Sequence, residues 1–257
     1  MLKAIAILRD RVTNPEAYPF TVPVIRNLTE LQFRSRVCFF VGENGTGKST
    51  LLEAIASHYG FGPEGENRNF SNDSSESNHS VEPLARALRL SFDNRTGAGF
   101  FLRAESFFNV ATQIDVLDEE PAFAPPISDS YGGQSLHTRS HGETFLTLLN
   151  IKFRRNGLFL LGEPEAALSP QRQLAFLVLM HDVVRDYKNA QFISSHSPIL
   201  LGYPEAQILS FDGPRIQETE YDQLANMQIV RRFLNDRDRF LEELFKETPS
   251  LFKDEAR

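Results

Sequence analysis

The most constraining feature of the sequence is a glycine-rich segment, Gly-Glu-Asn-Gly-Thr-Gly-Lys-Ser-Thr, at positions 42–50. The apolar run Arg36 to Val41 precedes it and predicts a short buried strand. Apolar residues then recur at helical spacing from Leu51 to Tyr59, and Gly60 ends the pattern. The segment fits G-x-x-x-x-G-K-[ST] and lies between a strand and a helix, which is the context of a phosphate-binding loop.

This loop pattern has a direct chemical meaning. Glycines let backbone N–H groups turn inward around phosphate oxygens, and the N-terminus of the following helix adds its dipole. We expect Lys48 to reach the β- and γ-phosphates of ATP, Ser49 to ligate Mg²⁺ and Thr50 to contact the α-phosphate. The expected ATP-binding residues are Gly42, Glu43, Asn44, Gly45, Thr46, Gly47, Lys48, Ser49 and Thr50.

Two further predicted strands end in polar side chains. The apolar run Leu158 to Leu161 leads to Glu163, and Gln191 to Ser194 leads to His196. Ligands bind at the carboxyl ends of strands in open α/β sheets. A glutamate there can polarise the water that attacks a γ-phosphate, and a histidine can hydrogen-bond that water or the phosphate. We therefore expect Glu163 and His196 to be catalytic.

Composition and charge restrict the alternatives. With 257 residues, 41% of them hydrophobic, the chain can bury one large core, and we expect one domain with insertions. The formal net charge of −7 argues against nucleic-acid binding by bulk electrostatics, while a local basic patch that contacts DNA stays open. Cys38 is the only cysteine, so an intrachain disulfide and a cysteine-based metal cluster are excluded, and we expect a small buried hydrophobe there.

The membrane classes are also disfavoured. No window of the sequence reaches transmembrane length, and the first ten residues lack the apolar stretch of a secretory leader. We expect a soluble, cytoplasmic protein with no membrane insertion.

Between the motifs, the pattern predicts alternating strands, loops and helices. Polar composition indicates loops at Phe61 to Ser80 and Asp118 to Gln134. The segments Ala87 to Phe92 and Gly99 to Arg103 flank turn-forming residues and predict a hairpin of paired strands. Asp212 and Gly213 are the predicted turn of a second hairpin. Helices are predicted over about 106–117, 142–153, 170–188 and 221–245, and a first strand over 2–8.

The order of four motifs resembles a known family. GENGTGKST, SHGE, LLGEPEAALSP and SSHSP follow one another as in the compact bacterial ABC-type ATPases that are labelled AAA-family, relatives of the heads of chromosome-maintenance and recombination-repair proteins. The resemblance covers nearly the whole chain. It implies an α/β P-loop NTPase fold of ABC-ATPase type: a mixed β-sheet core flanked by helices, an antiparallel β subdomain and a small helical signature subdomain.

The resemblance also implies a head-to-tail dimer that ATP holds together. The signature motif of one subunit contacts the γ-phosphate held by the other, and Ser140, His141, Gly142 and Glu143 match that motif. Ala167, Leu168 and Ser169 match the D-loop at the same interface. ATP and Mg²⁺ are the implied cofactors, and an ATP-dependent homodimer with a further, unidentified protein partner is the implied assembly.

Two family positions are less well defined by the sequence. For the Gln-loop residue, Glu105 and Gln113 are both candidates, with Glu105 preferred and assigned also as a metal ligand. Tyr18, Phe20 and Arg11 lie in the segment that approaches adenine in relatives, although aromatic residues are more often core residues.

Within the single domain we expect four parts. Residues 1–60 and 81–105 form an N-terminal lobe with the phosphate loop, and residues 106–157 form a helical signature insertion. Residues 158–220 carry Glu163 and His196, and residues 221–257 form C-terminal helices.

The function that best fits these features is an ATP-gated clamp that regulates a partner, with DNA repair and anti-phage defence as open pathways. A small-molecule kinase would share the phosphate loop but not the later motifs. A transporter cassette fits the EPEAALSP segment less well. A nucleotide sensor without hydrolysis stays open because of one departure from the family pattern.

That departure is Gly162, where relatives carry an aspartate that helps to hold Mg²⁺. Glycine has no ligand, so Mg²⁺ would rely on Ser49, phosphate oxygens, water and Glu105. Because metal positioning stabilises the transition state, we expect ATP to bind but hydrolysis to be slow.

We predict that Gly162→Asp raises the steady-state rate of ATP hydrolysis, because it returns a carboxylate to the metal site. Phosphate release measured side by side for the two proteins tests this. An unchanged rate would show that Gly162 does not limit hydrolysis.

Overall fold

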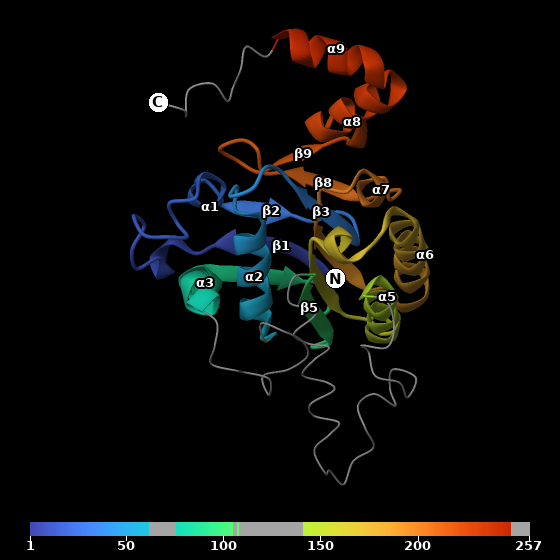
Figure 1. Cartoon of the computed structure of the whole chain (residues 1–257). Coiled ribbons are helices and arrows are strands. Elements are labelled where there is room, and N and C mark those ends of the chain that lie inside the picture. The colour runs from blue at the N-terminus through green and yellow to red at the C-terminus, as the bar shows by residue number, and fades with distance from the viewer. Residues whose placement is uncertain (62–75, 105–106, 108–140, 248–257) are drawn as a thin grey trace. The chain divides into compact units, whose positions relative to one another are not determined.

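The computed structural model describes residues 1–61, 76–104, 107 and 141–247 (Figure 1). These residues fall into two compact units, Met1–Glu218 and Thr219–Arg257. The first unit contains two β-sheets with helices, and the second contains helices. The mixed α/β fold with a separate antiparallel sheet confirms the expected fold class.

The larger sheet has six strands in the order β5-β6-β7-β3-β8-β9. Its central strands are short apolar runs that are buried along their whole length, as parallel strands covered on both faces are. The pairs β5 with β6, β6 with β7, β7 with β3 and β3 with β8 are all parallel. The strands are β3 (Val37–Val41), β5 (Gly99–Arg103), β6 (Leu158–Gly162), β7 (Ala190–Ser194), β8 (Gln207–Ser210) and β9 (Gln217–Thr219).

The smaller sheet has three antiparallel strands in the order β2-β1-β4. They are β1 (Leu2–Ile7), β2 (Glu30–Gln32) and β4 (Leu88–Phe92), and α3 (Glu76–Ala87) leads directly into β4. The short helices η1 (Arg9–Arg11) and α1 (Pro23–Arg26) lie between β1 and β2 in the chain.

Helix α2 (Lys48–Tyr59) joins the two sheets (Figure 1). It contacts β4 of the small sheet and β6 and β7 of the large one. Leu51, Leu52 and Ile55 of this helix are fully buried in one apolar cluster with Cys38 and Phe40 of β3. Gly60 ends the helix in the left-handed conformation, as predicted.

The opposite face of the large sheet is covered by α5 (His141–Lys152) and α6 (Pro170–Tyr187), which lie side by side (Figure 1). Phe153 packs its ring against Phe159 of β6 at a centroid distance of 4.6 Å and against Phe176 of α6 at 6.4 Å. Side chains alternate between the two faces along each strand, so Leu160 faces α2 whereas Phe159 faces α6.

The structure corrects two predictions. Gly99–Arg103 does not form a hairpin with the strand before it, because β4 pairs with β1 and β5 pairs with β6. The apolar run Phe100 to Leu102 is buried on both faces, which suits an edge strand of the large sheet that is covered on both sides rather than a half-exposed hairpin arm. The predicted loop Phe61 to Ser80 is too long, since its last five residues belong to α3. The predicted elements at 106–117 and 118–134 lie outside the described residues apart from Phe107.

Cys38 is the buried hydrophobe that the sequence predicts, with no exposed surface. Its thiol donates weakly to the carbonyl of Ser35, and burial raises its pKa above the ordinary range of a thiol. This side chain is therefore a packing residue of β3.

The C-terminal unit consists of η6 (Tyr221–Gln223), α8 (Ala225–Asn235) and α9 (Arg237–Glu247). Phe233 and Phe240 hold α8 and α9 together with an edge-on ring contact at 5.6 Å, and Arg232 pairs with Glu243. Among the described residues, no helix is both long enough and apolar enough to span a bilayer.

We predict that Gly99→Ala destabilises the fold by about 3 kcal/mol, because its Cβ would lie 2.0 Å from the carbonyl oxygen of Leu158 at the start of the β5–β6 pair. Gly97→Ala is the matched control, since Gly97 also has a positive φ but open space around it. It should cost only about 1 kcal/mol. Equal losses for the two variants in urea unfolding would contradict this packing.

Candidate functional site

The phosphate-binding loop lies between β3 and α2, as the sequence predicts. Gly42, Gly45 and Gly47 all have positive φ, which brings successive backbone N–H groups to the inner side of a turn. Gly47 is also sterically required, since a Cβ there would lie 2.8 Å from Cγ1 of Val22. The loop is thus shaped by its glycines and ends at the N-terminus of a twelve-residue helix.

Lys48 is held inside this loop. Its side chain is buried, and Nζ donates to the carbonyl oxygens of Gly42 at 2.5 Å and Glu43 at 2.9 Å. Burial lowers the pKa of Lys48, and nearby carboxylates oppose that shift. These carboxylates belong to Glu163, Asp212, Glu43 and Glu165. The lysine therefore lies within electrostatic reach of acids from three strand ends, and a phosphate that enters the loop would compete with carbonyl oxygens for its protons.

Asp212 is a loop residue that the sequence analysis assigned to a turn. Its Oδ1 accepts the backbone N–H of Glu43 at 2.7 Å, and its Oδ2 accepts the hydroxyl of Ser210 at 3.2 Å. Because β3 and β8 are parallel neighbours, the residue after each strand reaches the same edge of the sheet. The usable signal was a carboxylate directly after a buried strand, the same signal that identified Glu163.

Glu163 follows β6 in a left-handed conformation, with φ 50° and ψ 53°. A non-glycine residue held there costs of order 1–3 kcal/mol, and such strain is concentrated at functional sites. Its backbone N–H donates to the carbonyl of Ser194 at 2.9 Å, so the end of β6 is tied to the end of β7. The short helix η5 (Pro164–Ala167) begins next.

Glu165 joins this turn to the His196 segment. Its Oε1 accepts the backbone N–H of His196 at 2.6 Å and the hydroxyl of Ser195 at 3.0 Å. The structure thus brings Glu163 and the His196 segment to one edge of the sheet, where Glu165 links them. Glu165 lies within the motif EPEAALSP, but the sequence alone assigned it no role.

Gln173 of α6 extends the same network to the predicted D-loop. Its amide nitrogen donates to the carbonyl of Leu168 at 3.0 Å, and its amide oxygen accepts the hydroxyl of Ser197 at 2.5 Å. Ser197 also caps α7 (Pro198–Leu201) by accepting two backbone N–H groups. A single buried side chain therefore couples Leu168 to the segment that carries His196.

The predicted signature motif is described only in part. Ser140 and the side chain of His141 lie outside the described residues, as do the Gln-loop candidates Glu105 and Gln113. Gly142 lies in the first turn of α5, where a Cβ would come within 2.9 Å of the carbonyl oxygen of Ala167. Glu143 lies 3.8 Å from Arg172 of α6. The start of α5 is therefore packed against the D-loop segment of the same chain.

The residues proposed near adenine differ in exposure. Tyr18 is 48% exposed, and its hydroxyl is hydrogen-bonded to that of Thr50 at 2.9 Å. Phe20 is 2% exposed and belongs to the core cluster. Tyr18 thus adjoins the loop, whereas Phe20 is a packing residue.

Comparison with known proteins gives one family match. The model of the family described as AAA domain matches residues 20–247, most of the chain. The chain belongs to the AAA domain family. This confirms the family that the motif order indicated. No curated protein matches the chain.

Several solved structures resemble the AAA domain over most of its length. A putative metal-chelate type ABC transporter in an inward-facing conformation is 16% identical, with 91% of this chain and 90% of that chain covered and a TM-score of 0.49. The SMC head domain from Thermotoga maritima is 15% identical, with 85% and 99% covered and a TM-score of 0.48. A dimeric bacterial ABC transporter cassette is also 15% identical, with 86% and 99% covered and a TM-score of 0.46. The family assignment rests on the domain match.

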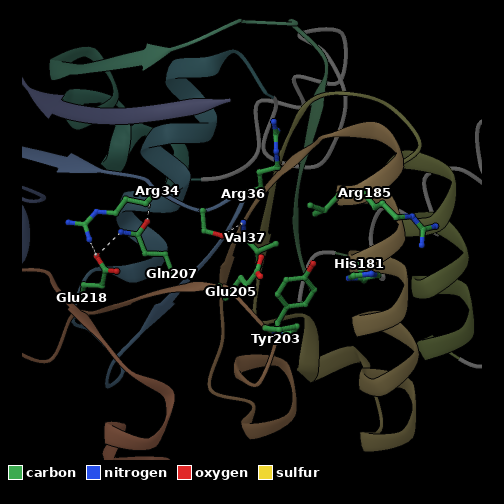
Figure 2. Close-up of a pocket in the computed structure, with 13 residues that line it drawn as sticks. Arg34, Arg36, Val37, His181, Arg185, Tyr203, Glu205, Gln207 and Glu218 are labelled. Carbon is green, nitrogen blue, oxygen red and sulfur yellow. Dashed lines mark hydrogen bonds and ion pairs between the residues drawn. The ribbon is translucent and has the colours of Figure 1, made fainter.

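The AAA domain also has a cavity of about 620 Å³ at the opposite edge of the large sheet (Figure 2). It lies at the amino ends of β3 and β8, between Val37, Gln207 and the last turns of α6. Two of its arginines form ion pairs: Arg34 pairs with Glu218 at 3.4 Å, and Arg185 pairs with Asp186 at 2.8 Å. This cavity is separate from the phosphate loop.

The fit of ATP and of Mg²⁺ to the AAA domain differs. The glycine conformations, the helix N-terminus and the buried Lys48 fit a polyphosphate. For Mg²⁺, Ser49 supplies a hydroxyl, but Gly162 supplies no ligand, and no cluster of three metal-ligating side chains occurs within the described ranges. The site thus fits a polyphosphate, and it fits the metal only through Ser49 and the phosphates themselves.

We predict that Gln173→Leu destabilises the AAA domain by about 2 kcal/mol, because it leaves the carbonyl of Leu168 and the hydroxyl of Ser197 without this partner in a buried place. Gln171→Leu, on the exposed side of the same helix, should change stability by less than about 0.5 kcal/mol. Urea unfolding of both variants tests the coupling. If Gln173→Leu unfolds at the wild-type urea concentration, the network does not hold the two segments together.

Proposed function

We propose that this AAA domain binds ATP in the loop around Lys48, hydrolyses it slowly, and closes head to tail with a second copy when ATP is bound. The observation that carries the proposal is the convergence at one sheet edge. The buried Lys48, the strained Glu163 and the His196 segment meet there, held by Asp212 and Glu165. The membership in the AAA domain family supports an ATPase in general.

We propose the following roles for the residues of this site. Backbone N–H groups of residues 42–50 and the N-terminus of α2 hold the phosphates, and Lys48 exchanges two carbonyl partners for phosphate oxygens. Glu163 polarises the attacking water, and His196 hydrogen-bonds the γ-phosphate or that water. Bound Mg²⁺ would neutralise phosphate charge, with Ser49 as its protein ligand.

Slow hydrolysis is proposed because position 162 has no side chain. A carboxylate there would help to hold the metal, and its loss removes part of the transition-state stabilisation while the phosphate loop stays intact. The same observation favours a second candidate, a nucleotide sensor that binds ATP and dimerises without turnover.

Dimerisation is proposed from the signature and D-loop positions. Ser140 and Gly142 would contact the γ-phosphate bound by the other copy from the start of α5, and Ala167 to Ser169 would lie at the same interface. Ser169 is exposed, and its side chain makes no capping bond to α6, so it is available to a partner.

Beyond ATP, we propose that closure of the two copies regulates a protein partner in the cytoplasm. DNA repair and anti-phage defence are the pathways we favour. Within the domain, residues 1–60 and 81–105 would hold the nucleotide, 106–157 would present the signature, 158–220 would carry the catalytic residues, and 221–257 would form an appended helical part.

We predict that Lys48→Ala abolishes ATP binding, whereas Glu163→Gln keeps it, lowers turnover by at least about 100-fold and increases the fraction of dimer at saturating ATP. ATP turnover and molecular mass by light scattering, measured on the same samples, test this. Lys246→Ala, which removes an exposed lysine paired with Glu242, is the matched control and should behave as wild type.

The outcomes separate the candidates. Dimerisation with turnover supports the clamp, and dimerisation without turnover supports the sensor. Turnover by a protein that stays monomeric at saturating ATP would exclude both, and phosphate transfer to an acceptor other than water would indicate a kinase.

A further inference from the structure

Gly162 lies in a row of three residues that are paired across the neighbouring strands β5, β6 and β7. In the parallel register, Arg103 of β5 is opposite Gly162 of β6, and Gly162 is opposite Ser194 of β7. Side chains alternate along each strand, and the buried residues two positions earlier, Phe101 and Leu160, pack in the cluster around α2. Position 162 therefore points to the face of the sheet that carries the phosphate-loop helix.

Arg103 occupies the space beside this glycine. A Cβ at position 162 would lie 3.1 Å from Cγ of Arg103. The guanidinium forms an ion pair with Glu53 of α2, and both side chains are mostly shielded from solvent, at 32% and 14% exposure. Glu53 follows Ser49 by one helical turn and so lies on the same side of α2. A guanidinium whose charge is balanced by Glu53 is thus held between β6 and the helix that starts at the phosphate loop.

Ser194 provides a second observation at the same place. The residue is fully buried, and its Oγ has no hydrogen-bond partner among the described residues. A buried hydroxyl without a partner is costly, so it marks a position where an acceptor is expected. The groups that flank Gly162 are therefore a guanidinium and a hydroxyl.

The guanidinium makes this set of groups unlike a metal site. A metal needs acceptor oxygens, whereas a guanidinium only donates, and the Ser194 hydroxyl can donate to the same anionic oxygens. Arginine keeps its charge at any ordinary pH. Resting on the proposed ATP-binding function, we propose that Arg103, positioned by Glu53, replaces part of the charge neutralisation that Mg²⁺ supplies, so that this site binds ATP with little dependence on Mg²⁺.

The test is the affinity for ATP in Mg²⁺ and in EDTA, measured by calorimetric titration of the whole chain. Wild-type affinity should fall no more than about threefold in EDTA. Arg103→Gln with Glu53→Gln removes both charges together, so that neither is left buried alone. In this double variant EDTA should weaken binding at least about tenfold more than in wild type.

Two further variants separate a charge effect from a structural one. Arg103→Lys keeps the charge and should retain binding in EDTA. Gly162→Asp combined with Arg103→Gln and Glu53→Gln provides a metal-binding carboxylate without its cationic neighbour, and should be the most Mg²⁺-dependent protein of the series. The affinity of Gly162→Asp alone for ATP should depend on Mg²⁺ less than that of this combined variant, because Arg103 would share the new carboxylate with the metal.

Arg185→Gln is the matched control, since it removes a paired arginine from the opposite edge of the sheet and should titrate as wild type. Melting temperatures without nucleotide check that each variant is folded. A wild-type protein that binds ATP but loses more than about 30-fold in affinity in EDTA would overturn this inference and leave the proposed function standing. A wild-type protein that binds no ATP in either buffer would overturn the proposed function itself.

Discussion

The parallel pairing of β3 with its neighbours β7 and β8 is the constraint on which the rest of the site depends. Parallel strands end at the same edge, so residues far apart in the chain are delivered to one place. Through this pairing the phosphate loop after β3 meets Asp212 after β8 and the His196 segment after β7. Next to β7, β6 adds Glu163, whose N–H bonds the end of β7. The burial of α2 between the two sheets then fixes the N-terminus that the loop leads into.

Much of this arrangement could be predicted from local sequence patterns. The strand, loop and helix around Lys48 are specified by contiguous residues, because the glycines require positive φ and the apolar spacing requires a helix. Pairing partners are not local. The segment Gly99–Arg103 has the composition of either a hairpin arm or a strand of the parallel sheet, and only its contact with β6 decides between them. The hydrogen bonds made by Asp212, Glu165 and Gln173 could not be predicted from local patterns either, because each joins segments 24 or more positions apart.

The charges around the loop explain how a buried lysine is stabilised there. Lys48 is buried, but its protons are shared between two carbonyl oxygens, and four carboxylates within electrostatic range favour its charged form. Asp212 in turn uses a loop N–H as its donor. These contacts satisfy the loop internally, and a polyphosphate would replace them with stronger charge-assisted bonds. The Arg103 guanidinium, paired with Glu53, lies on the α2 side of β6.

The proposed function depends on where a nucleotide binds and on which groups Lys48 contacts in the bound state. An experimental structure of the protein crystallised with a non-hydrolysable ATP analogue is the most direct measurement. We predict phosphate density inside the 42–50 loop, with Nζ of Lys48 moved from the carbonyls of Gly42 and Glu43 to phosphate oxygens. Phosphate density elsewhere, for example in the arginine-lined cavity at the amino ends of the strands, with Lys48 still on its carbonyl partners, would contradict it.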